Sequence, residues 1–243
     1  MISSFFHTAF YTPLYNGLIF LLGFVPGGDV GVAIILFTIF VKLVLFPLSA
    51  RSITTQRRMR ELEPEMKAVQ EKYKGDKEEQ ARATMALYKE KKLNPFSGFF
   101  LILIQIPIII ALYQVFIGAG LPKINTELLY SFVHTPILVS MKFFGILNVA
   151  ERSLILALLA GITQYFQAKY VLPPSAPRSG GEKKEGSFRD EFMRGMNLQM
   201  QYFLPVFITF VSWTVSGAVA LYWVTNNLFS IAQELYMRKK NLK

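Results

Sequence analysis

The sequence predicts an all-α membrane protein with five transmembrane helices, an N-terminal interfacial amphipathic helix and a cytoplasmic helical hairpin. Three observations predict this fold class. Apolar residues make up 52% of the 243 residues, more than a typical soluble domain contains. Five apolar segments approach the roughly 20 residues that a helix needs to cross a bilayer. The Lys and Arg residues concentrate in alternate connections between these segments.

The expected elements follow one another along the whole chain. Residues 1–29 are expected to form an interfacial helix and turn on the extracytoplasmic side, because Pro13 and several polar and aromatic side chains interrupt the apolar stretch. The transmembrane helices are expected at 30–50, 95–118, 150–171, 198–216 and 217–236. The remaining segments are a cytoplasmic helical hairpin (51–94), an extracytoplasmic loop (119–149), a flexible cytoplasmic linker (172–197) and a short basic cytoplasmic tail (237–243).

The charge of these connections predicts the orientation. Twelve Lys and Arg residues lie in 51–92, five in 172–197 and four in 237–243, whereas 119–149 holds only Lys123 and Lys142. Basic loops remain in the cytoplasm. Five spans then place the N-terminus outside and the C-terminus inside. No leader-like segment precedes the first apolar stretch, which favours a bacterial plasma (inner) membrane over an organelle.

The hairpin predicted at 51–94 has two interpretations. Apolar residues recur at helical spacing on both sides of a turn at 74–77. The pair is either a solvated structural element or a surface that docks partners. The basic residues that would carry docking are Arg57, Arg58, Arg60, Lys72, Lys74 and Lys77.

Lys42 is the most informative residue, because a cation within a membrane span costs about 2.5–3.5 kcal/mol on insertion scales. It either faces a hydrated interior or extends its stem to the headgroups. Thr38 lies one turn before it, and the last span carries Trp223, Asn226, Asn227, Ser230 and Glu234 along one face. Such polar residues also act as hydrogen-bonding contacts between helices. The set as a whole favours a hydrated cavity, with Lys42 unpaired inside it.

The sequence lacks the residues that several classes of chemistry require. The chain has no cysteine and two histidines, His7 and His134, and it has no phosphate-binding glycine motif and no zinc-protease motif. We therefore expect a protein that is not an enzyme, with no cofactor, no metal site and no direct nucleic-acid recognition.

Several short stretches together resemble the YidC/Oxa/Alb insertases. They are Val41 to Ser49 with its Lys42 and Pro47, Met85 to Lys89 followed by Asn94-Pro95, Leu103 to Ile108, and Met200 to Asn226 with Ser216-Gly217 and Leu221-Tyr222-Trp223. The resemblance runs from about Thr12 to Met237. It implies a five-span bundle with a positively charged hydrophilic groove that is open to cytoplasm and lipid and closed outside.

The resemblance also implies roles for individual residues. Lys42 takes the position of a groove cation that is usually arginine, while Thr38 and Trp223 match substrate-facing positions. Gln164 or Gln167 matches a polar groove position. The implied substrates are nascent membrane proteins in the lipid bilayer, and a Sec translocon, signal-recognition components and the ribosome are candidate partners.

Two other functions account for some of the same residues. A small anion channel or transporter would use Lys42 as a selectivity residue. A structural assembly scaffold would use the hairpin alone.

Overall fold

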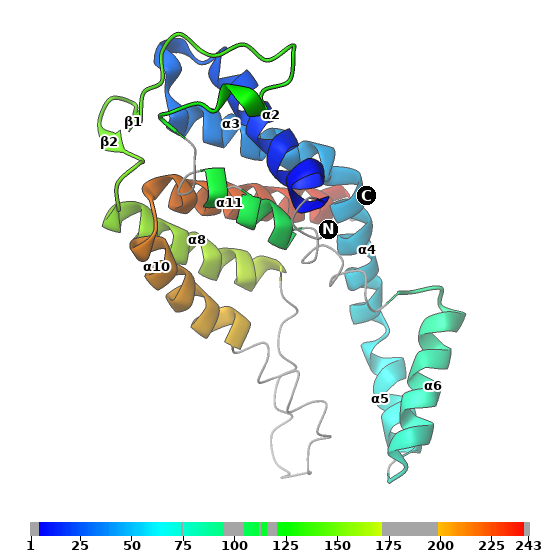
Figure 1. Cartoon of the computed structure of the whole chain (residues 1–243). Helices are drawn as coiled ribbons and strands as arrows, with labels where there is room; N and C mark the ends of the chain where they lie inside the picture. The colour runs from blue at the N-terminus through cyan, green and yellow to red at the C-terminus, as the bar shows by residue number, and fades with distance from the viewer. Residues whose placement is uncertain are drawn as a thin grey trace. The chain divides into compact units, whose positions relative to one another are not determined.

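The computed structural model describes residues 5–73, 75–94, 105–111, 113–115, 121–171 and 199–240, which are mostly helical (Figure 1). The expected linker 172–197 and much of the expected second span, including 95–104, lie outside these residues. The chain divides into two compact units. Unit 1 comprises Met1–Lys42 and Pro107–Lys243, and unit 2 comprises Leu43–Ile106.

Helix length and composition bear on the expected spans. Within the described ranges, no single helix is both long and apolar enough to cross a bilayer. The helices Val30–Val44 and Phe46–Met59 meet the length and composition criteria only when they are taken together across a bend.

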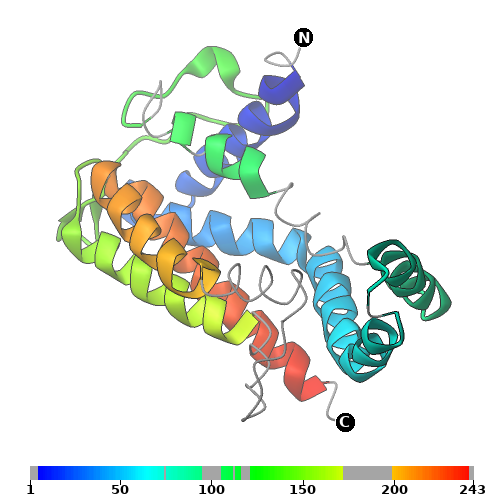
Figure 2. The same ribbon diagram turned by 90° about the horizontal axis from the view of Figure 1, so that it is seen from below.

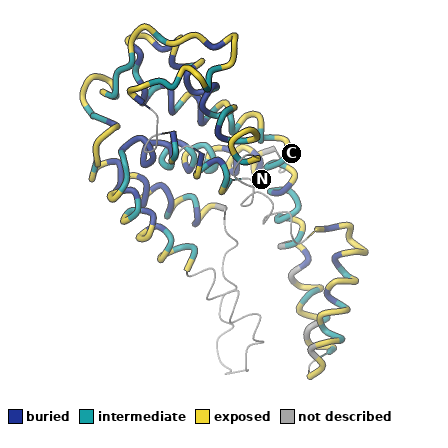
Figure 3. Tube along the Cα trace, viewed as in Figure 1, coloured by how far each residue is buried: buried dark blue, intermediate teal, exposed yellow. Residues whose placement is uncertain are grey.

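Unit 1 contains three helices that pack side by side: α8 (Leu154–Val171), α10 (Leu204–Thr214) and α11 (Gly217–Lys240). Helix α8 lies against both α10 and α11 in the two views of Figures 1 and 2. Gly161 permits the approach of α10, because a Cβ there would lie 1.8 Å from Thr209 Oγ1. Figure 3 shows buried residues where these helices face one another and exposed residues on their outer sides.

Helix α10 begins beside a proline and ends at an extended residue. A π-helical turn, Gln199–Phe203, precedes it, and Pro205 occupies its first turn, where a missing N–H is tolerated. The helix ends at Thr214, and the extended residue Val215 leads into α11 at Gly217. Helix α11 continues to Lys240, so the start of the expected basic tail is helical.

Two helices and one long loop also belong to unit 1, as do the helical residues 107–111 and 113–115. Helix α2 (Thr12–Leu22) follows a π-helical turn, His7–Tyr11, and precedes α3 (Val30–Val44). Gly17 of α2 packs on α3, since a Cβ there would lie 2.7 Å from the Phe37 ring. The loop 121–153 runs over α2, where the Asn16 amide donates to Leu128 O at 2.8 Å and accepts from Tyr130 N at 2.7 Å.

A short β-hairpin within this loop contacts α3. Strand β1 (Lys142–Phe143) pairs antiparallel with β2 (Leu147–Asn148), where the sequence predicted only a loop. Asp29 caps α3 through Oδ1, which accepts from Val32 N at 3.1 Å, while its Oδ2 accepts from Phe144 N at 2.7 Å. One carboxylate thereby connects the hairpin to the first turn of α3.

Loop 121–153 also binds the start of α11. Gly217 N donates to Glu151 O at 2.7 Å, and Ala218 N donates to Val149 O at 2.8 Å. The first residues of α3 and α11 are thus hydrogen-bonded to the same loop, which continues directly into α8.

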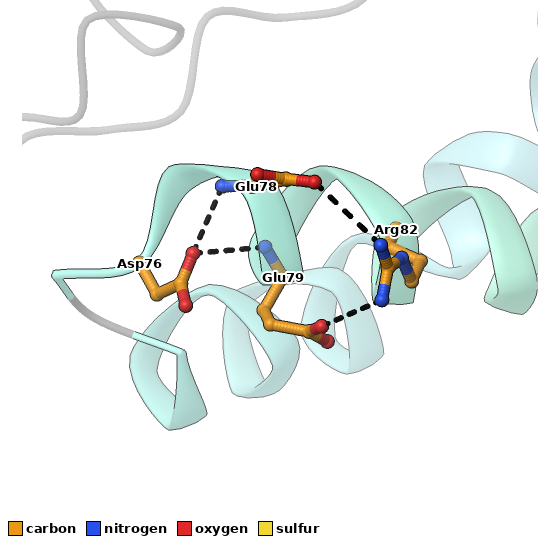
Figure 4. Close-up of polar contacts among 4 residues, drawn as sticks. All are labelled: Asp76, Glu78, Glu79 and Arg82. Atoms are coloured by element: carbon orange, nitrogen blue, oxygen red, sulfur yellow. Dashed lines mark hydrogen bonds and ion pairs between the residues drawn. The ribbon is translucent and has the colours of Figure 1, made fainter.

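Unit 2 contains α4 (Phe46–Glu61), α5 (Glu63–Lys72) and α6 (Lys77–Glu90). Leu62, Tyr88 and Leu93 form its buried cluster, with Met59 and Met66 packed against it. Asp76 caps α6, because its carboxylate accepts from Glu78 N at 3.1 Å and Glu79 N at 3.0 Å (Figure 4). The turn before this cap contains Gly75 with φ of 105°, which favours glycine.

The segment predicted as one helix over 30–50 is divided in the structure. Helix α3 ends at Val44, and α4 begins at Phe46 and runs on to Glu61. Pro47 has no backbone N–H to continue the hydrogen bonding of α3. The end of the predicted first span and the start of the predicted hairpin therefore belong to a single helix, α4.

Candidate functional site

The Lys42 side chain lies within unit 1, near the end of α3, and is half-buried. Its Nζ donates to Ser230 Oγ of α11 at 3.2 Å. No carboxylate of a described residue lies within 4.0 Å of this ammonium. An ammonium has three N–H donors, so the bond to Ser230 leaves donors available for another acceptor.

Ser230 connects Lys42 to a neighbouring amide on α11. The Ser230 hydroxyl donates to Asn226 O at 2.8 Å, and it therefore presents its lone pairs to the Lys42 ammonium. Asn226 is half-buried, and its Oδ1 is a buried acceptor without a hydrogen-bond partner in the described structure. We call Lys42, Ser230 and Asn226 the Lys42 cluster. Ser230 thus joins the Lys42 ammonium to the backbone carbonyl of Asn226, and the side-chain amide of Asn226 donates to Asn227 Oδ1 at 3.5 Å.

Asn227 has a different environment from Asn226. It is 1% exposed, and its amide donates to Thr163 Oγ1 of α8 at 3.3 Å. The Thr163 hydroxyl in turn donates to carbonyls of its own helix. For Asn227 the structure therefore matches the alternative interpretation of an interhelical contact.

The other predicted groove residues do not contact Lys42 in any described bond. Gln164 is buried, and its Nε2 donates to Gln167 Oε1 at 2.9 Å along α8. Thr38 is buried and donates to Ile34 O at 2.7 Å within α3. Trp223 is half-buried on α11, one helical turn before Asn226.

Glu234 is the carboxylate of α11, and it is 6% exposed. Its Oε1 lies 3.0 Å from Arg238 Nε, and the same guanidinium donates to Tyr170 O at the end of α8. Glu234 is therefore paired on its own helix. The Lys42 charge remains without an acidic partner among the described side chains.

Arg57, Arg58 and Arg60 of the predicted docking residues lie on α4, Lys72 lies on α5, and Lys77 begins α6. Arg57 pairs with Glu61 at 3.2 Å, Arg58 is exposed, and Lys72 lies over the Tyr73 ring at 5.3 Å. Lys74 lies outside the described residues, as do the side chains of Arg60 and Lys77. Of the predicted docking residues whose side chains are described, Arg58 and Lys72 are thus the exposed ones.

Three further buried side-chain oxygens lie outside the predicted site residues. Gln114 Oε1, Ser212 Oγ and Ser216 Oγ have no hydrogen-bond partner within the described structure. The signal for all three was a polar residue in or beside an apolar segment, which sequence alone does not assign to a partner. Where side chains are described, no three His, Asp or Glu residues converge in a way that could hold a metal ion.

Comparison with known proteins places these features in a family context. The family model described as 60Kd inner membrane protein matches residues 21–243. Proteins named "Membrane protein insertase YidC" from Francisella tularensis subsp. novicida (strain U112), subsp. tularensis (strain SCHU S4 / Schu 4) and subsp. holarctica (strain LVS) are each 34% identical over 207 residues. The aligned region covers 85% of this chain and 32% of each relative. The chain thus spans about a third of the length of these relatives.

Proposed function

Because the chain belongs to the 60Kd inner membrane protein family, we propose that it is a membrane protein insertase that lowers the barrier for polar segments of nascent membrane proteins. Its similarity to proteins named as insertases supports this proposal. The protein would reside in a bacterial plasma membrane and carry out no covalent chemistry.

The observation that carries the proposal is the state of Lys42. It is a half-buried cation bound to a neutral hydroxyl, with no carboxylate in ion-pair distance among the described residues. A cation in such a place is costly unless water or an anionic partner reaches it. We infer that a hydrophilic groove, open to cytoplasm and lipid, contains Lys42, Ser230 and Asn226.

The mechanism follows from the cost of moving charge through hydrocarbon. A substrate carboxylate that must cross a bilayer loses its hydration, at a large free-energy cost. In the groove, the donors of Lys42 not used by Ser230 would bind this carboxylate. The apolar helix of the substrate would then enter lipid, which supplies the driving force.

Substitutions at Lys42 test this mechanism. We expect Lys42→Arg to retain insertion of a substrate with an acidic translocated flank, Lys42→Ala to reduce it and Lys42→Glu to reduce it further. Loss of one hydrogen bond to a charged group costs about 1.5 kcal/mol, which corresponds to roughly tenfold slower insertion if that contact forms in the rate-limiting step. Protease protection of the flank in proteoliposomes measures the rate.

Two controls separate this effect from changes in expression or topology. Lys169→Ala removes one exposed cation from the end of α8, and it should leave insertion unchanged. A substrate with a neutral flank should respond least to the Lys42 variants. Equal insertion of the acidic substrate by the protein and by its Lys42→Ala and Lys42→Glu variants would reject the role of the charge.

We also propose the five-span topology with the N-terminus outside and the C-terminus in the cytoplasm. The chain contains no cysteine, so single-cysteine variants report one site each. Ile137→Cys, in the loop 121–153, should react with an impermeant maleimide added outside cells. Lys72→Cys should react only after the membrane is opened. Labelling of both from the same side would contradict the topology.

Unit 2 would serve as a docking surface for an acidic region of a translocon, a signal-recognition component or the ribosome. Arg58 and Lys72, which are exposed on α4 and α5, support this role. Charge reversal at both sites should abolish co-purification of the partner, while Lys89→Glu on α6 provides a matched exposed control. Undiminished co-purification would leave unit 2 with a structural role only.

A further inference from the structure

The turn of the β-hairpin presents large apolar side chains away from the protein. Phe144 is 70% exposed and Ile146 is 89% exposed. Ile137 and Leu138, in the loop segment that leads to the hairpin, are 100% and 64% exposed. We call these four residues the apolar tip. Scattered exposed apolar residues are ordinary, but a group that a loop holds outward indicates an interaction surface.

The backbone of the turn is unusual for its residues. Phe144 and Gly145 have φ of 49° and 74°, and Ile146 N donates to Phe143 O at 3.0 Å. Two successive positive φ values and this bond describe a type I′ turn, in which Asn or Asp normally precedes the glycine. A bulky residue with positive φ is an outlier, and such outliers cluster at functional sites.

Neighbouring contacts hold this turn in place. Phe144 N donates to the Asp29 carboxylate at 2.7 Å. Phe143 packs toward α3, because a Cβ at Gly31 would lie 2.4 Å from its ring. Phe143 is therefore directed toward the protein, while its neighbour Phe144 is exposed.

The second pair of the apolar tip, Ile137 and Leu138, is held by contacts to the turn before α3. Ser140 N donates to Gly28 O at 2.8 Å and Val30 N donates to Ser140 O at 3.0 Å. Gly28 itself packs on Leu138, since a Cβ there would overlap the Leu138 carbonyl at 2.0 Å. The two pairs of the apolar tip thus flank the adjacent residues Gly28 and Asp29.

The anchors of the loop fix its distance from the helices. The loop bonds the first residues of α3 and α11 and enters α8 at Leu154. The turn at Gly145 lies four residues from Val149, a reach of roughly 13 Å in an extended strand. Leu154 and Ile155, the first residues of α8, are 57% and 65% exposed. The exposed apolar surface therefore resumes on the helix that follows the hairpin.

We propose that the apolar tip inserts into the interfacial zone of the outer leaflet and anchors the loop 121–153 to lipid. The inference depends on the proposed membrane-spanning arrangement, which places the starts of α3, α8 and α11 at the outer boundary. Aromatic and aliphatic side chains partition into this zone, about 5–10 Å into the boundary of headgroups and acyl chains.

The charged residues near the apolar tip are compatible with a lipid headgroup region. Lys142 is exposed on β1, where its ammonium can reach lipid phosphates while the turn is in the interface. The nearby Glu151 accepts from Asn148 Nδ2 at 2.6 Å, so this carboxylate is engaged within the loop. The exposed apolar tip and the exposed Lys142 therefore lie on the same stretch of the loop.

Fluorescence quenching of single-cysteine variants in proteoliposomes tests the proposal. Ile146→Cys is labelled with an environment-sensitive dye, with Glu127→Cys as the polar control in the same loop and Leu158→Cys on the exposed face of α8 as the lipid control. At position 146 we expect blue-shifted emission, strong quenching by a lipid labelled near its headgroup and weak quenching by aqueous iodide. At position 127 we expect the reverse.

The lipid control distinguishes two kinds of failure. Lipid quenching at Leu158 together with iodide quenching at Ile146 would overturn the proposed anchoring alone and would favour a protein partner for the apolar tip. Equal lipid quenching at 127 and 146 would also overturn a specific role of the tip. Iodide quenching at Leu158 would reject the membrane-spanning arrangement itself, and with it this inference.

Discussion

Asn16 joins helix α2 to the loop 121–153, and its removal should loosen that contact by a predictable amount. The side chain is 2% exposed, donates to Leu128 O at 2.8 Å and accepts from Tyr130 N at 2.7 Å. Asn16→Ala therefore removes two hydrogen bonds to a segment more than a hundred residues away. At about 1 kcal/mol for each bond, the contact weakens by about 2 kcal/mol.

Amide hydrogen exchange of Tyr130 measures this effect directly, since local opening sets the rate. A loss of about 2 kcal/mol corresponds to roughly 30-fold faster exchange. Tyr15→Phe is the graded comparison, because it removes one acceptor, the hydroxyl that binds Asn125 N at 2.7 Å. It should accelerate exchange about fivefold, on the basis of about 1 kcal/mol for one bond.

Exchange at amides of α8 provides the internal control, because α8 has no described bond to Asn16. Unchanged exchange at Tyr130 in Asn16→Ala would refute the reasoning. It would mean that the hydrogen bonds at Asn16 do not hold the loop. Uniform acceleration over α8 as well would instead indicate that the substitution disrupts unit 1 as a whole.

Three further predictions follow from contacts described above. Burial raises the pKa of Tyr15 above its ordinary value of 10.0. The stabilisation that the neutral phenol contributes is therefore complete below pH 10 and is lost as the pH rises through the raised pKa. Tyr15→Phe should remove this pH dependence from the hydrogen exchange of Tyr130. Gly161→Ala should destabilise the α8–α10 contact by about 1–3 kcal/mol through overpacking, measured by denaturant titration in detergent. Asp76→Ala should weaken the start of α6 by about 1 kcal/mol, measured by exchange at Glu78 and Glu79.

Each of these three predictions has a matched control variant and a result that would contradict it. Tyr11→Phe tests the neighbouring phenol, whose pKa burial also raises, and a pH dependence that persists without either hydroxyl would contradict the assignment. Thr209→Ala should partly relieve Gly161→Ala, and additive losses would argue against the close contact. Asp76→Asn keeps the acceptor, so exchange as fast as in Asp76→Ala would argue against the cap.

The helical class could be predicted from sequence, and so could a lysine within an apolar helix at position 42, because both depend on local signals; the role of Lys42 stays a prediction. Apolar segments, charged connections and one cation within an apolar run are visible without knowledge of packing. The coarse all-α prediction is confirmed, whereas the number and direction of the spans stay a prediction. The division at Leu45 could have been predicted from Pro47, but the apolar run across it favoured a single helix.

Partner choice along α11 could not be predicted. Helical spacing placed Asn226, Asn227 and Ser230 on one face, but adjacent residues point about 100° apart, and this rotation decides which helix each one meets. Asn226 and Ser230 lie with Lys42, and Asn227 binds Thr163 of α8. The β-hairpin also escaped prediction, because its turn carries Phe144 where a turn residue would be expected.

The carboxylate of Asp29 has a practical consequence for engineering this protein. Because its two oxygens serve the first turn of α3 and the backbone of Phe144, the hairpin and that helix share one acceptor. An epitope tag or protease site inserted at 143–146 would free one oxygen and alter how α3 begins.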